Sequence, residues 1–89
     1  MKYFEWDENK RNLNIEKHGI DFIDAIHVFD DPLRVEVETM RGIEKRYQTI
    51  GRIEDVTILV AYTYRNEKRR IISTRVASRA ERAVYEKMR

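Results

Sequence analysis

Arginines gathered in the C-terminal half are the residues of this sequence best suited to chemistry. Four of them fall close together, at Arg65, Arg69, Arg70 and Arg75. A guanidinium is a planar fork of donors that binds a phosphate through two hydrogen bonds at once. Two or three such groups on one surface would hold a phosphodiester and stabilise the charge that develops during its cleavage. Alternatively, these arginines protect sheet edges or pair with Glu67 and Glu81.

Strand alternation predicts which of these side chains share a surface. The run from 69 to 76 is rich in β-prone residues and indicates a strand. Side chains on one face would be Arg69, Ile71, Ser73 and Arg75. Those on the other would be Arg70, Ile72, Thr74 and Val76. Ser73 and Arg75 are therefore expected to lie together, and Arg46 on a neighbouring strand could join either face.

One histidine and several tyrosines are further candidates for contact with RNA. His18 follows an expected helix and precedes Gly19, and an imidazole there could transfer protons near neutral pH. The alternative is a helix-end histidine that bonds a free carbonyl. Tyr62 and Tyr64 alternate onto one face of a strand, and Tyr47 and Tyr85 complete an aromatic set. These rings could stack on unpaired bases, or they could simply fill the core.

The acidic residues do not show the spacing of a metal site, and the chain carries no phosphate-binding loop, dinucleotide fingerprint or nucleophile elbow. We therefore expect neither a metal nor another cofactor. Cleavage of RNA is compatible with that expectation because the 2′-hydroxyl supplies an internal nucleophile. The protein then needs only to orient the strand, assist proton transfer and stabilise charge.

Length and charge point to one small domain with an anionic partner. With 89 residues, we expect a single domain over 1–89. Residues 1–40 hold five Lys or Arg against ten Asp or Glu, whereas residues 41–89 hold thirteen against six. Such a split suggests a nucleic acid for the basic half, although a solvated charged surface without a partner is the alternative. The absence of cysteine, of a signal peptide and of a long apolar run favours a cytoplasmic protein without membrane contact.

Hydrophobic periodicity predicts an α+β fold. Asp7 and Ser78 are typical helix N-caps, Ser78 with Glu81 as a capping box, and Gly19 is placed to end the first helix. The final helix should turn Ala80, Ala83, Val84 and Met88 inward. The expected elements are a short extended segment at 4–6, helices at 8–17 and 22–29, strands at 33–38, 45–52, 56–64 and 69–76, and a helix at 79–88. This order gives a short N-terminal strand, two helices, an antiparallel sheet of about four strands and a C-terminal helix.

The order of several motifs along the chain is its most specific feature. In the N-terminal half these are Phe4-Glu5-Trp6-Asp7, Asn12-Leu13, Lys17-His18-Gly19, Phe22, Ala25 and Val28-Phe29-Asp30-Asp31-Pro32. In the C-terminal half they are Glu44, Arg46-Tyr47, Ile50-Gly51, Leu59-Val60, Tyr62, Arg65, Arg70-Ile71-Ile72-Ser73, Arg75-Val76-Ala77 and Glu81 to Tyr85. With these spacings, nearly the whole chain resembles the BrnT family of toxins from type II toxin–antitoxin systems. One departure is Thr74, where the family commonly has alanine.

The resemblance implies a RelE-like α+β fold and a ribonuclease that inhibits translation without a metal. It also implies a BrnA-like antitoxin that neutralises the toxin in a heterotetramer and alone contacts operator DNA. The catalytic residues we expect are His18, Arg46, Tyr62, Arg65, Arg70 and Arg75. The further RNA-binding residues we expect are Arg69, Ser73 and Tyr47. The alternative is a non-catalytic module that binds nucleic acid or the antitoxin, such as an inactive toxin acting as corepressor.

Overall fold

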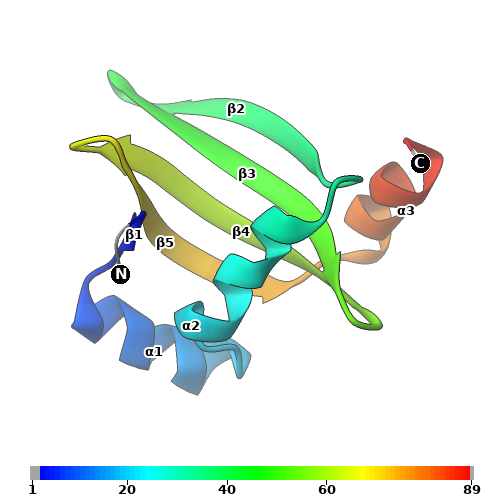
Figure 1. Ribbon diagram of the computed structural model, residues 1–89, viewed down its shortest axis with the longest axis horizontal. Coiled ribbons are helices and arrows are strands. Elements are labelled where there is room, and N and C mark those ends of the chain that lie inside the picture. The colour runs from blue at the N-terminus through cyan, green and yellow to red at the C-terminus, as the bar shows by residue number, and fades with distance from the viewer. Residues whose placement is uncertain (1–2, 89) are drawn as a thin grey trace.

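The computed structural model describes residues 3–88 as one sheet with helices on both sides (Figure 1). The elements in chain order are β1 (Phe4–Glu5), α1 (Glu8–His18), α2 (Phe22–Ala25), a 3₁₀ helix η1 (Ile26–Asp30), β2 (Val35–Arg41), β3 (Glu44–Ile53), β4 (Val56–Arg65), β5 (Lys68–Val76) and α3 (Arg79–Lys87). Figure 1 shows α1 and α2 gathered on one side, with α3 at the far end of the strands. Within residues 3–88, no helix is long and apolar enough to cross a bilayer.

The sheet is mixed and has five strands in the order β1-β5-β4-β3-β2. Strands β2 to β5 form the antiparallel meander that the sequence predicts. The short strand β1 adds to β5 in parallel, with Phe4 opposite Arg69 and Glu5 opposite Arg70. The α+β prediction is therefore confirmed. The observed sheet has one strand more than the four expected, and this strand, β1, pairs in parallel rather than antiparallel. A segment of two residues is too short for its alternation to reveal a partner.

The predicted helix caps are confirmed. The side chain of Asp7 accepts hydrogen bonds from the backbone N–H groups of Asn9 and Lys10. Gly19 ends α1 with φ of 73°, a left-handed conformation that glycine adopts without steric cost. Ser78 and Glu81 form the reciprocal capping box at the start of α3. These local signals fix where α1 and α3 begin, and thus which side chains they carry toward the sheet.

Helix α2 and η1 cover one side of the sheet, here named the helical face. Phe22 and Val28 are fully buried there against Val60 and Tyr62 of β4. The expected helix over 22–29 is in fact a short α-helix that continues as η1. The N–H of Asp31 closes that tighter turn on the carbonyl of Val28, a common way for a short helix to end.

Gly51 allows η1 to lie directly on β3. A Cβ atom added at Gly51 would meet Cγ2 of Val28 at 2.7 Å and Cβ of Arg34 at 3.1 Å. Both neighbours are held by the backbone of η1 and the segment after it, so neither can move away freely. The missing side chain thus sets the spacing between η1 and the sheet.

Helix α3 packs on the opposite face through a side different from the one predicted. Tyr85 is buried among Ile50, Leu59 and Ala77, and its hydroxyl donates to Oδ2 of Asp31 at 2.7 Å. The residues expected to turn inward are instead exposed: Ala80, Ala83, Val84 and Met88. That prediction is wrong because the helix presents Glu81 and Tyr85, whose polar groups find partners on the sheet, rather than its aliphatic stripe.

Candidate nucleic-acid interface

A β-bulge in β5 decides which arginines share a surface. Ala61 of β4 lies opposite Ser73, but the next residue, Tyr62, lies opposite Ile71. Ile72 is therefore an extra residue without a partner on β4, and the alternation of β5 is reset at that point. Arg70, Ser73 and Arg75 lie on one face as a result, and Arg69 lies on the other. The predicted partition, with Arg69 beside Ser73 and Arg75, is wrong for this reason.

The face opposite the helical face gathers the predicted cations and is here named the basic face. Gln48 of β3 lies opposite Ala61, and Ala61 lies opposite Ser73, so every second residue from Gln48 shares that face. Its predicted site residues are Arg46, Arg65, Arg70, Ser73 and Arg75. Arg70 and Arg46 are two strands apart, which corresponds to about 10 Å between their backbones. Helix α3 covers only the end of this face at Ile50 and Leu59.

Carboxylates orient three of these arginines. Arg46 Nε lies 2.6 Å from Glu44, Arg70 Nη1 lies 2.6 Å from Glu5, and Arg75 binds Glu81 through two bonds of 2.6 and 2.8 Å. The alternative of pairing with Glu81 is thus correct for Arg75. Each guanidinium has five N–H donors, so one or two bonds to a carboxylate leave donors for a phosphate. The ion pairs therefore position these cations without occupying them fully.

Glu44 reveals a cation that the sequence analysis did not select. Its hydrogen bond from Arg46 lowers the pKa of the Glu44 carboxyl, and the positive charges of Arg65 and Lys10 lower it further. Lys10 belongs to α1, on the opposite flank of β5 from β3.

His18 lines a pocket between α1 and β5, here named the α1 pocket. The pocket has a volume of about 280 Å³ and is lined by Lys10, Leu13, Asn14, Lys17, His18, Ile72 and Ser73. Ser73 belongs to both the α1 pocket and the basic face, so the pocket that His18 lines borders the face that carries the arginines. Sequence reasoning missed Lys10 and Lys17. Counted from Lys10, Lys17 and His18 are at positions i+7 and i+8, a spacing that directs side chains to one side of a helix and was the available signal.

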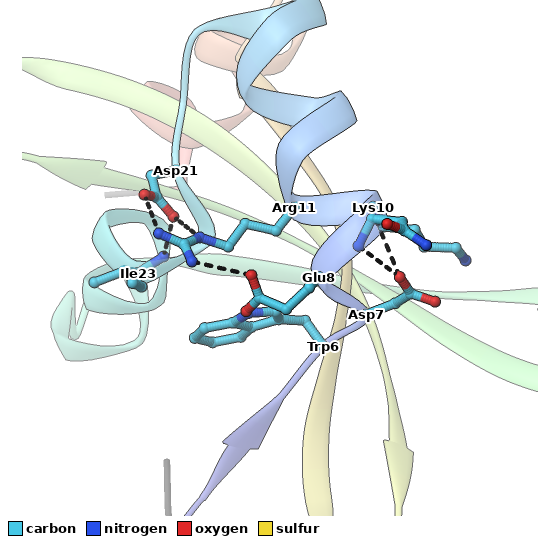
Figure 2. A network of polar contacts seen from close by, with 8 residues as sticks. Trp6, Asp7, Glu8, Lys10, Arg11, Asp21 and Ile23 are labelled. Carbon is cyan, nitrogen blue, oxygen red and sulfur yellow. Dashed lines mark hydrogen bonds and ion pairs between the residues drawn. The ribbon is translucent and has the colours of Figure 1, made fainter.

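Two sets of contacts hold α1 in place beside β5. The side-chain amide of Asn14 donates to the carbonyl of Thr74 at 2.9 Å, and its oxygen accepts from the N–H of Thr74 at 3.1 Å. Figure 2 shows Arg11 reaching from α1 to Asp21, at 2.8 and 2.9 Å, and to Glu8 at 3.1 Å. The hydrogen bond from Arg11 also lowers the pKa of the Asp21 carboxyl. The α1 pocket is thus fixed relative to the sheet.

The remaining predicted site residues lie on the helical face, away from the basic face. Tyr62 is fully buried, and its hydroxyl donates to Glu36. Burial raises the pKa of this hydroxyl and the bond to Glu36 raises it further. Tyr47 stacks on Tyr62 with ring centroids 5.2 Å apart, and Arg69 lies over Phe29. The structure therefore does not bring Tyr62, Tyr47 and Arg69 together with the other candidates.

Carboxylate and histidine side chains of residues 3–88 form no group of three that could hold a metal ion. The side chain of His27 is 65% exposed and lies 3.5 Å from Asp30.

The fold and these cations define a class of protein, a small α+β domain with several arginines on one face of its sheet. The model of one family, described as "Ribonuclease toxin, BrnT, of type II toxin-antitoxin system", matches residues 6–81. The chain therefore belongs to the BrnT family of ribonuclease toxins, as its motifs predict. The matched region includes the basic face and the α1 pocket. No curated protein sequence matches the chain significantly.

Proposed function

We propose that this protein is a metal-independent endoribonuclease whose substrate lies on the basic face. The observation that carries the proposal is that Arg46, Arg70 and Arg75 share the basic face with Ser73, which also lines the α1 pocket. Guanidinium groups from different strands would bind adjacent phosphates of a single strand. They would also stabilise the additional negative charge of the transition state.

The proposed reaction begins with the 2′-hydroxyl of the substrate. Its oxygen attacks the neighbouring phosphorus, its proton passes to a base, and the bond to the 5′-oxygen breaks as that oxygen takes up a proton. His18 is our candidate for one of these transfers because an imidazole titrates near neutral pH. Lys10 and Lys17 line the same pocket and would hold the phosphate there by charge.

Membership of the family also underlies our proposal for the cellular role. Cleavage of RNA would inhibit translation in the cytoplasm, and a BrnA-like antitoxin would neutralise the protein in a heterotetramer. Operator DNA would be contacted by the antitoxin alone. The single domain over 1–89 is proposed to be RelE-like.

Cleavage of single-stranded RNA in excess EDTA tests the proposal. The wild-type protein should cleave, and Arg46→Met and Arg75→Met should each lower kcat/KM about a hundredfold or more, as expected for loss of one charge-stabilising group. Arg79→Met is the matched control because Arg79 is an exposed arginine of α3 outside the proposed site. Wild-type rates for both site variants would refute the site. RNA binding without cleavage by the wild-type protein would favour the non-catalytic module instead.

A further inference from the structure

Two arginines on the helical face have no counter-ion in the described part of the chain. The guanidinium carbon of Arg69 lies 4.2 Å from the ring centroid of Phe29, and that of Arg34 lies 5.5 Å from the same centroid. The Nε atoms of both arginines are buried without a hydrogen-bond partner. Neither guanidinium is within ion-pair distance of a carboxylate of residues 3–88, although Asp30 and Glu36 belong to the same face. Two neighbouring cations held against one ring thus keep donors that an anion could use.

Arg69 also lines a cavity of a size suited to a small ligand. The cavity has a volume of about 370 Å³, within the range of ligand sites. Its lining residues are Tyr3, Phe4, Ile26, His27, Phe29, Asp30 and Arg69. Tyr64 lies directly opposite Arg69 across the β4–β5 ladder, and half of its surface is exposed. An accessible ring beside an unpaired guanidinium matches the two parts of a nucleotide, the base and the phosphate.

The β4–β5 hairpin joins this helical-face group to the basic face. The next pair toward the hairpin tip is Arg65 opposite Lys68, and alternation directs these two side chains to the basic face. The turn at Asn66 and Glu67 then closes the hairpin. Arg65 and Lys68 of the basic face are therefore the residue pair next to Arg69 of the helical face, at the tip of the hairpin.

We propose that unpaired RNA passes over the tip of the β4–β5 hairpin and occupies both faces. A nucleotide flanking the cleaved bond would stack its base on Tyr64, and its phosphate would bind Arg69 with help from Arg34. The substrate class is then single-stranded RNA longer than the nucleotides at the cleaved bond. This inference rests on the proposed function, because the basic face is taken as the place of cleavage.

Binding of a 2′-O-methyl oligonucleotide tests the inference independently of cleavage, because that RNA lacks the nucleophile. We would measure the affinity for an oligonucleotide of about ten nucleotides by fluorescence anisotropy over a range of salt concentrations. Arg69→Met should weaken binding about tenfold and reduce the salt slope by about 0.7, the value for one phosphate contact with a single strand. Arg69→Lys should restore most of that slope.

Tyr64→Leu should weaken binding about tenfold with an unchanged salt slope, since stacking releases no counter-ion. The control Arg79→Met should bind as the wild type does. A 2′-O-methyl dinucleotide is too short to pass over the tip, so its affinity should not respond to Arg69→Met. Circular dichroism of each variant would establish that it is folded.

The outcomes separate this inference from the proposed function. Wild-type binding by both Arg69→Met and Tyr64→Leu, together with weakened binding by Arg70→Met, would overturn the second site and leave the cleavage proposal intact. Failure of the wild-type protein to cleave RNA, with the predicted salt slopes, would overturn the nuclease and keep the second site. If Arg69→Met and Tyr64→Leu lost binding to a protein antitoxin but bound RNA as the wild type does, the inference would also be overturned.

Discussion

The charge of Glu81 should contribute a measurable, pH-dependent part of the stability. Its carboxylate binds Arg75 through two hydrogen bonds and also accepts from the N–H of Ser78 at 2.8 Å. The bonds from Arg75 are the main reason that the pKa of Glu81 falls from 4.5 to about 2. Glu81→Gln is the sharpest perturbation because a glutamine oxygen can still accept from Ser78, so that only the charge and one of the two hydrogen bonds from Arg75 are lost.

The expected loss follows from this pKa change. Without screening, a shift of this size corresponds to roughly 3 kcal/mol. The side chain of Arg75 is 39% exposed, and solvent screening of such a pair reduces the contribution to about 1–2 kcal/mol. For a domain of this length, the Tm should fall by roughly 5–10 °C.

The sign of the pH dependence is set by the lowered pKa. A carboxyl that is more acidic in the folded state stabilises the fold at every pH above its unfolded pKa of 4.5. That contribution is lost as the pH falls from there toward the folded pKa of about 2. The stability difference between wild type and Glu81→Gln should therefore be full at neutral pH and shrink steadily in acid.

Urea unfolding over a series of pH values measures this difference. Trp6 is the single tryptophan and packs edge-on against buried Phe22, so its fluorescence reports global unfolding. Glu16→Gln, at an exposed position of α1, is the matched control and should change stability little. Equal stability of Glu81→Gln and wild type at neutral pH would refute this account. A deficit that stays constant in acid would do the same, because it would not come from the charge.

Three further substitutions test individual contacts of the fold. Asn14→Ala should lower the unfolding free energy by about 2–3 kcal/mol in urea titrations, because it leaves buried polar groups of Thr74 without partners; full stability would contradict the role given to this amide. Gly51→Ala should cost about 1–3 kcal/mol through overpacking against Val28, and an unchanged Tm would show that η1 yields easily. Tyr62→Phe should retain RNA cleavage while stability falls by about 1 kcal/mol; a large loss of kcat with normal folding would restore Tyr62 to the catalytic residues.

Much of the local structure was determined by the sequence alone. Asp7, Gly19 and the Ser78–Glu81 box mark helix ends because their hydrogen bonds and backbone preferences involve only near neighbours. The strict alternation of residues 33–38, the β-prone composition of the other three long strands and the turns between them predicted the meander for the same reason. The motifs also identified the family, and they included His18 and the arginines of the basic face.

Tertiary structure decided which side chains meet, because that depends on register and on orientation between elements. One extra residue at Ile72 moves Arg69 to the helical face and joins Arg70 to Ser73. A slip of one position reverses every side chain beyond it, and nothing in the local sequence marks where the slip falls. The side of α3 that faces the sheet is likewise set by distant partners of Tyr85. Local patterns specify elements, whereas the assembly of a site is specified by contacts between residues far apart in the chain.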